Sequence, residues 1–180
     1  NRNYQDVQDP AITCRFHLTD SEKFGDNAYF LAWTTTPWTL PANLALCVGP
    51  HIDYVAVKDV SDGAVYILAK ARLDSYYKKP EGYEVVAELT GAELTGLRYE
   101  PLFSYFEDHA NSFQVLSDDY VTTSDGTGIV HIAPAYGEDD YRIGREAGIE
   151  LVDPLDAEGA FTAAVPDFSG QNCKEADKGI

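Results

Sequence analysis

Short apolar stretches separated by polar turns recur along the whole chain. Residues 12–18 alternate between apolar and polar side chains, which predicts a strand with one buried face. Residues 28–33 are apolar and aromatic without a break, which predicts a strand buried on both faces. Further apolar runs predict strands at 44–48, 53–58, 64–68, 83–89, 113–116, 120–123 and 129–133.

Few stretches have helical spacing. Residues 69–79 predict one helix, and a second, amphipathic helix opens at Glu138 and ends near Gly148. Residues 61–63 carry a hairpin signal, whereas residues 91–99 fit either a bulged strand or a turn. Many short strands with few helices predict an α+β, mainly β fold, namely a mixed β-barrel core, closed or nearly closed, with a few peripheral helices.

The length of 180 residues suits one domain with a substantial core. Because the sequence contains no methionine and starts at Asn1, it reads as a piece of a longer polypeptide. We therefore expect a single domain over 1–180, in which the polar residues 1–10 and 171–180 are linkers at its two ends.

Acidic residues outnumber basic ones, with 30 Asp and Glu against 13 Lys and Arg and a formal charge of -17. This charge opposes nucleic-acid binding over a broad surface, and only residues 70–79 are locally basic. A nucleic-acid partner would therefore be held mainly by another domain, or insert a short end into a pocket. No apolar run approaches the ~18 residues of a membrane helix. The three widely spaced cysteines fit reduced thiols, so we expect a cytoplasmic location.

The stretch from Trp33 to Asn43 concentrates hydroxyl groups at a strand end. Thr34, Thr35 and Thr36 end the strand, with alternate hydroxyls on opposite faces. Thr36 and the following proline suit the N-cap and first position of one helical turn over 37–40, which Pro41 would end. Its free amides, at residues 38 and 39, would then point toward the threonines. Such a turn suits a phosphate, a carbonyl oxygen or an oxyanion, although a capped turn without a ligand fits the spacing as well.

A second informative stretch runs from residue 125 to residue 149. Two glycines form a tight turn, followed by a buried strand that carries His131 and ends at Pro134. Three carboxylates, the last of them Asp140, then open the amphipathic helix. Two structural alternatives fit the same residues: carboxylates that serve only the helix dipole, and a His131 that is a satisfied core histidine.

The sequence lacks the residue patterns of several common catalytic and binding sites. No serine or cysteine lies on a nucleophile elbow, the four histidines have no metal-ligand spacing, and no phosphate-binding glycine loop is present. We therefore expect no metal and no cofactor. Any hydrolysis would use water.

Together, the run from Thr34 to Asn43 and the run from Gly126 to Tyr141 closely resemble the editing domain of isoleucyl-tRNA synthetases. The resemblance covers nearly the whole chain and implies hydrolysis of valine misattached to the 3' end of isoleucine tRNA, and also of valyl-adenylate. The remaining domains of the same synthetase would be further partners. The synthetic signatures H-I-G-H and K-M-S-K-S are absent, so this chain would not activate amino acids.

The resemblance also implies roles for individual residues. Asp140 would bind the substrate's α-ammonium, while Thr35 and Thr36 would position the ester and the attacking water, so these three form the predicted catalytic set. His131 and Trp33 would bound the side-chain pocket. The family varies at Tyr136, to which we assign no role. Asn43 would support the loop or the adenosine. The predicted substrate-binding set is Trp33, Thr34, Thr36, Asn43, His131, Ala133, Pro134 and Asp140.

Two other functions remain open from the sequence. One is valyl-type editing, which clears threonine, although valyl and leucyl enzymes typically carry arginine at the position of Thr36 and an acidic residue at that of Trp38. The other is a non-catalytic module that only binds the tRNA 3' end.

Overall fold

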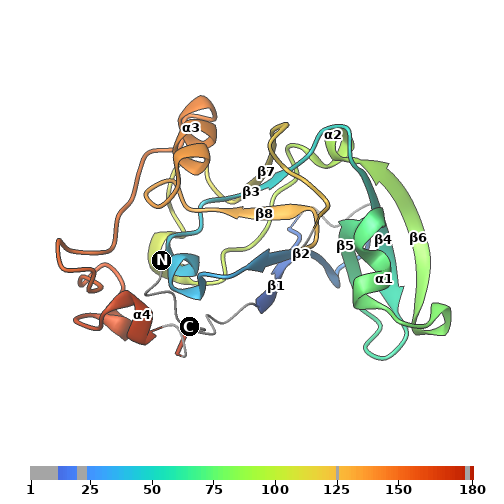
Figure 1. Cartoon of the computed structure of the whole chain (residues 1–180), viewed down its shortest axis with the longest axis horizontal. Coiled ribbons are helices and arrows are strands. Elements are labelled where there is room, and N and C mark those ends of the chain that lie inside the picture. The colour runs from blue at the N-terminus through green and yellow to red at the C-terminus, as the bar shows by residue number, and fades with distance from the viewer. Residues whose placement is uncertain (1–11, 20–23, 125, 177–178) are drawn as a thin grey trace, which may run out of the picture.

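The computed structural model describes residues 12–19, 24–124, 126–176 and 179–180. At its centre is a mixed sheet with the hydrogen-bonded order β6-β4-β5-β2-β8-β3-β7, and β1 pairs with β2 (Figure 1). The strands are β1 (Ile12–His17), β2 (Ala28–Thr34), β3 (Ala45–Val48), β4 (Asp53–Asp59), β5 (Val65–Ala69), β6 (Tyr83–Thr90), β7 (Gln114–Ser117) and β8 (Ile129–Ile132).

Strand β2 is the point where the sheet divides. One edge of β2 pairs with β1 along its whole length, in antiparallel register. On the other edge its first half pairs with β5, with Ala28 opposite Val65, and its end pairs with β8, with Trp33 opposite Val130. Two wings, β5-β4-β6 and β8-β3-β7, therefore diverge from β2 (Figure 1). The end of β2 lies where they separate.

The predicted mixed β-barrel core with a few peripheral helices is confirmed. Among the described strands, β6 and β7 end the order and do not pair with each other, so the sheet forms a half-barrel. The helical segments are short, and the longest is α3. They are η1 (Pro37–Ala42), η2 (Lys70–Arg72), α1 (Leu73–Tyr76), η3 (Pro80–Gly82), α2 (Gly91–Leu94), η4 (Ser104–Phe106), α3 (Glu138–Glu146), η5 (Pro166–Phe168) and α4 (Cys173–Ala176).

The unbroken apolar run of β2 contributes to two different cores, as its pattern predicted. Phe30 belongs to the main cluster, together with Phe16, Ile67 and Ile132, all fully buried. The next residue, Leu31, belongs to a second cluster beneath α1. Because both faces of β2 are buried, the position of its carboxyl end is fixed on two sides.

Three predicted segments differ from the structure. The predicted helix over 69–79 is only η2 and α1, because the backbone of Tyr77 is extended and its hydroxyl donates to Asp59. Residues 120–123 form a loop and no strand. Residues 91–94 form α2, whose capping box joins Thr90 and Glu93.

The expected linker at the carboxyl end is wrong in part. Within 171–180, residues 173–176 form α4, and Ala176 is buried against Phe161 and Val165. The expected linker at 1–10 lies outside the described residues. In the described part of the chain, Cys14, Cys47 and Cys173 are free thiols, and no helix has the length and apolar character to cross a membrane.

Candidate functional site

A cavity of about 340 Å³ lies where the two wings separate. It brings together the end of β2, η1, β8 and the start of α3, which are distant in sequence. All of the predicted site residues line it except Asn43 and Pro134. Those that line it are Trp33, Thr34, Thr35, Thr36, His131, Ala133 and Asp140.

The three threonines present their hydroxyls in different environments. Thr34 is buried, Thr36 is half-buried and Thr35 is exposed, although all three line the cavity. The Thr36 backbone N–H donates to Thr34 Oγ1 at 3.1 Å, and Thr36 Oγ1 lies 3.3 Å from both Thr34 Oγ1 and Thr39 Oγ1. These hydroxyl contacts are long, so the Thr36 hydroxyl can exchange them for a ligand or a water.

The turn after the threonines differs from its prediction in three respects. Thr36 makes no side-chain cap, and the Thr39 N–H is not free, because it donates to the Thr36 carbonyl at 3.0 Å. The turn also continues past Pro41, since Asn43 N–H bonds to Leu40 O at 3.0 Å. A 3₁₀ turn tolerates the proline here and loses only the bond that its nitrogen cannot donate.

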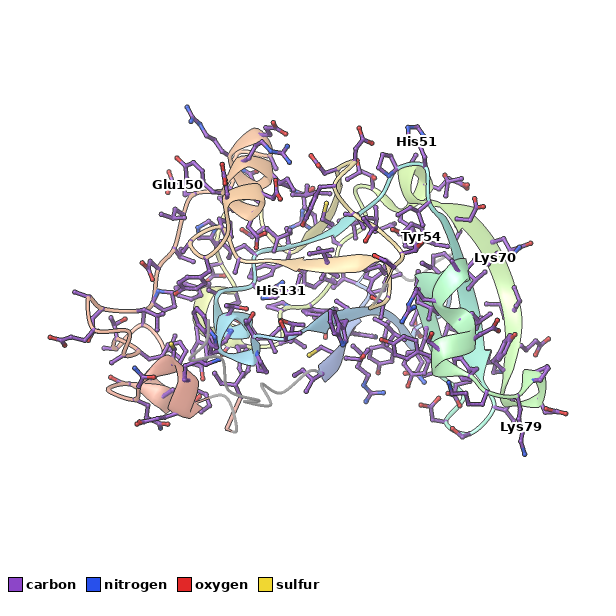
Figure 2. All side chains as sticks on the ribbon, viewed as in Figure 1. His51, Tyr54, Lys70, Lys79, His131 and Glu150 are labelled. Atoms are coloured by element: carbon purple, nitrogen blue, oxygen red, sulfur yellow. The ribbon has the colours of Figure 1, made fainter. Side chains whose placement is uncertain are left out.

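His131, on the side of β8 that faces η1, is held by both ring nitrogens (Figure 2). Asn43 Nδ2 donates to the Ala45 carbonyl at 2.9 Å and lies 2.8 Å from His131 Nδ1. A carbonyl only accepts, so Asn43 Nδ2 is the donor to both groups and Nδ1 is unprotonated. The proton of the neutral ring is therefore on Nε2, which lies 2.7 Å from Thr39 Oγ1.

Burial lowers the pKa of His131 to about 4. A proton on Nδ1 would also place two donors face to face. Tyr99 completes this arrangement from behind, because its buried hydroxyl donates to Asn43 Oδ1 at 2.5 Å. His131 is thus a neutral, rigidly oriented wall of the cavity. Asn43, behind it, fixes that orientation.

Asp140 lies in the first turn of α3 and reaches back toward β8. Its Oδ2 accepts the backbone N–H of Ala133 at 3.0 Å. Burial raises the pKa of this carboxyl, and the nearby Asp139 raises it further, whereas the Ala133 bond opposes the shift. Glu138 and Asp139, by contrast, are exposed and complement the helix dipole. A cationic group in the cavity would favour the ionised form of Asp140.

Another part of the lining comes from residues to which the sequence assigned no role. Tyr120, Val121 and Thr122 line the cavity from the loop after β7. Thr39 and Tyr136 also line the cavity. The hydroxyl of Tyr120 is buried and has no hydrogen-bond partner among the described residues. The sequence predicted a strand over 120–123. No local signal placed these residues at this cavity.

Among the described residues, no group of three or more His, Cys, Asp or Glu side chains is arranged to hold a metal ion. What lines the cavity is hydroxyls, a neutral imidazole and one carboxylate. This set can bind a cation, orient a polar group and limit the size of an apolar one.

The chain is similar in sequence to part of several longer proteins. No protein-family model matches it. It is 52% identical to an isoleucine–tRNA ligase of Bdellovibrio bacteriovorus and 48% identical to the cytoplasmic isoleucine–tRNA ligase of Mus musculus, in both cases over 100% of this chain. The chain spans only 17% and 14% of the length of these relatives.

Solved structures show the same fold at low sequence identity. The structure named GlLeuRS-CP1 has a TM-score of 0.69 and 17% identity, and the match covers 94% of this chain and 93% of that one. The editing domain of the P. knowlesi cytosolic leucyl-tRNA synthetase has a TM-score of 0.62 and 19% identity over 77% of this chain and 62% of its own. The resemblance stated from the two sequence motifs is confirmed. By sequence the chain is a segment of the isoleucine–tRNA ligase family, and its fold is that of the leucyl-tRNA synthetase editing domains.

Proposed function

We propose that this domain proofreads by hydrolysis, removing valine esterified to the 3' end of isoleucine tRNA and also cleaving valyl-adenylate. The single observation that carries the proposal is that Asp140 lines the same cavity as Thr35 and Thr36. A carboxylate for the amino group and hydroxyls for the ester are the two halves of an aminoacyl-ester site.

Asp140 suits an α-ammonium group because of its surroundings. One carboxylate oxygen is already bound to the Ala133 N–H, which fixes the side chain. Burial raises the pKa of this carboxyl, and an adjacent ammonium would offset that effect by favouring the charged form. The substrate would thus be held at its amino end, with its ester toward Thr35 and Thr36.

The reaction would use a positioned water as the nucleophile. Thr36 Oγ1 makes only long contacts to its neighbours, so it can hold this water or the ester oxygen. Catalysis would come from orientation and electrostatic stabilisation of the developing charge. The water oxygen would bond to the ester carbonyl carbon, and the bond from that carbon to the ribose oxygen would break. The proton lost by the water would pass to the leaving ribose oxygen through solvent or the neighbouring ribose hydroxyl, because both nitrogens of His131 are occupied.

Discrimination would come from the stiffness of the cavity. A synthetic site that prefers the larger amino acid gains only about 10- to 200-fold per methylene, and isoleucyl-tRNA synthetase is the usual example of this limit. A second, smaller cavity must therefore accept valine and reject isoleucine. Inserting one extra methylene into a packed site costs ~1–3 kcal/mol, provided that the walls do not yield. His131, held at both nitrogens, meets this condition.

The first test replaces the carboxylate. With Asp140→Asn, we expect deacylation of valyl-tRNA to fall at least about 100-fold, since the ammonium loses its counter-ion. The folded state should persist, as judged by circular dichroism. Glu138→Gln is the matched control, because it removes an exposed carboxylate from the same helical turn. Wild-type rates in Asp140→Asn would disprove the role of Asp140.

The same assay separates the alternative functions. Faster hydrolysis of threonyl-tRNA than of valyl-tRNA would identify valyl-type editing, and binding without multiple turnover would identify a non-catalytic module. The partners we propose are the tRNA 3' end and the remaining domains of the synthetase. The location we propose is the cytoplasm, by analogy with the mouse relative, whose name states it.

A further inference from the structure

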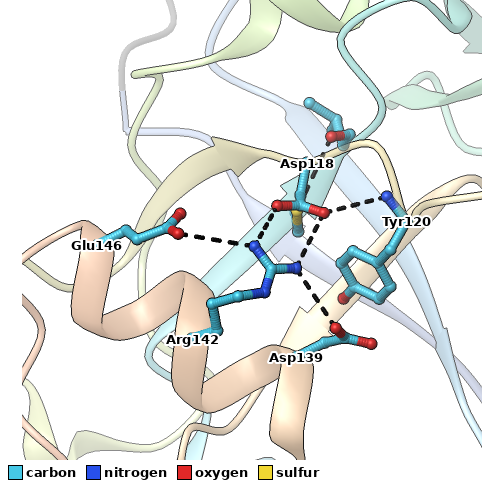
Figure 3. A network of polar contacts seen from close by, with 7 residues as sticks. Asp118, Tyr120, Asp139, Arg142 and Glu146 are labelled. Carbon is cyan, nitrogen blue, oxygen red and sulfur yellow. Dashed lines mark hydrogen bonds and ion pairs between the residues drawn. The ribbon is translucent and has the colours of Figure 1, made fainter.

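An ion pair connects two elements that contribute to the lining of the cavity, although neither of its residues lines it. Arg142 lies in α3, two residues after Asp140, and Asp118 follows directly after β7. The Asp118 carboxylate accepts hydrogen bonds from Arg142 Nη1 at 2.8 Å and from Nη2 at 3.1 Å (Figure 3). Two bonds to one planar guanidinium fix both direction and distance.

The same carboxylate organises the loop whose residues Tyr120, Val121 and Thr122 form one wall of the cavity. Asp118 Oδ1 also accepts the backbone N–H of Tyr120 at 3.1 Å (Figure 3), and the Asp118 N–H donates to Val48 O at 3.0 Å in β3. Tyr120 and the next two residues line the cavity. Asp118 therefore binds both this loop and the helix that carries Asp140.

The contact between Arg142 and Asp118 differs from the other ion pairs of Arg142. Within α3, Arg142 lies 3.3 Å from Asp139 and 3.8 Å from Glu146, so these pairs connect residues of one helix. Only the pair with Asp118 joins α3 to another element among the described contacts of Arg142. With 44% of the Arg142 side chain exposed, the pair is expected to add little to global stability.

We propose that Arg142 and Asp118 are a positioning pair, which holds the Asp140 helix at a fixed distance from the 120–122 wall and so sets the size of the side chain that the cavity admits. This inference rests on the proposed editing function. Distinguishing valine from isoleucine requires walls that do not separate under the strain of one methylene. The pair resists this separation because it joins α3, which carries Asp140, directly to the residue that holds the 120–122 loop.

The test measures specificity and not only rate. In Arg142→Gln, we expect the ratio of kcat/KM for valyl-tRNA over isoleucyl-tRNA to fall by about 3- to 10-fold, a part of what one methylene is worth. The fall should come from faster hydrolysis of the isoleucyl ester. Glu146→Gln is the control, because it removes an ion pair of Arg142 within α3 and leaves the bonds to Asp118.

A double-mutant cycle with Asp118→Asn tests whether the two residues act as a unit. If they do, the double variant loses little more specificity than Arg142→Gln alone. An unchanged ratio in Arg142→Gln, or an equal loss in Glu146→Gln, would overturn the proposal. Such an outcome leaves the editing function standing as long as the wild-type chain hydrolyses the valyl ester.

A measurement without substrate tests the positioning role of Arg142 and Asp118 independently of the editing function. Amide hydrogen exchange at Tyr120 should become faster in Arg142→Gln and stay unchanged in Glu146→Gln, because the Tyr120 N–H is bound by the Asp118 carboxylate. If the wild-type chain is inactive on both esters, the editing function fails. Unchanged exchange at Tyr120 in Arg142→Gln would then show separately that the pair does not position the loop.

Discussion

A histidine that lines a candidate hydrolytic site is a natural candidate for the general base, but the contacts of His131 argue against that role. Nδ1 accepts from Asn43, and Nε2 donates to Thr39, whose hydroxyl in turn donates to the Thr36 carbonyl at 2.8 Å. Neither nitrogen is free to take a proton from water. The hydrogen bonds instead make the ring an immobile surface. Its size and position decide what fits.

This burial predicts a specific pH dependence of stability. The pKa of His131 is lowered to about 4 in the folded chain, against about 6.5 when unfolded. As the pH falls, the unfolded state therefore binds the proton first. The contribution of neutral His131 to the free energy of unfolding is complete above pH 6.5 and is lost as the pH falls toward 4. The expected loss is on the order of 3 kcal/mol.

Urea unfolding of the wild type and of His131→Gln between pH 7 and pH 4 checks this expectation. Glutamine can accept from Asn43 and donate to Thr39 but does not titrate in this range. The difference between the two plots of unfolding free energy against pH separates the effect of His131 from that of Asp140. The raised pKa of Asp140 increases stability as the pH falls, which is the opposite direction. Parallel curves would show that His131 titrates normally.

At the scale of elements, the patterns that the sequence predicted well are those set by local chemistry. The double-sided burial of β2 and the start of α3 at Glu138 followed from apolar runs and helix signals. The loop at 120–123 could not be predicted in this way. Its apolar residues have the pattern of a strand, but the Tyr120 N–H donates to the Asp118 carboxylate and not to a neighbouring strand. The meeting of Thr36 with Asp140 was expected only through the family resemblance. Pairing between distant segments leaves no local trace.

The turn between the wings depends on Gly128. Its φ is +76°, and an added Cβ would lie 2.5 Å from the Cβ of Ala69 in β5. Gly63, in the β4–β5 hairpin, has a nearly equal φ of +75° but open space around it. Substitution at either position meets the same backbone strain, whereas only Gly128 also meets a steric clash.

We therefore expect Gly63→Ala to lower the free energy of unfolding by about 1–2 kcal/mol and Gly128→Ala to lower it by about 1–3 kcal/mol more. Denaturant titration of both variants provides the measurement. Equal losses would mean that β5 yields at Ala69 and that the separation of the wings is not rigid.

At the scale of the whole molecule, the charge of -17 bears on the proposed tRNA partner. A surface this acidic repels phosphates, so under the proposed editing function the domain would receive only the last nucleotide and its amino acid. The main affinity for tRNA would then come from the rest of the synthetase, which makes up most of the length of the relatives.

For the separate chain, we expect the KM for valyl-tRNA to lie within about threefold of that for a valyl ester of adenosine. Salt should change it only weakly, because few phosphates are contacted and few counter-ions are released. Steady-state deacylation from 50 to 200 mM salt tests this expectation. A steep loss of affinity would reveal a phosphate-binding surface that the net charge conceals.

The half-barrel leaves the outer strand β6 with an edge that the rest of the described sheet does not close. Unpaired strand edges tend to recruit the edges of other molecules. On β6, however, the carboxylates of Glu84 and Glu88 are exposed, and among the described residues only Glu88 is paired, with Lys70 at 2.7 Å. A bulge also shifts the register of β4 against β6 between Ala56 and Val57. Two copies that met along this edge would bring like charges together on mismatched backbones, so the acidity that turns phosphates away also discourages self-association.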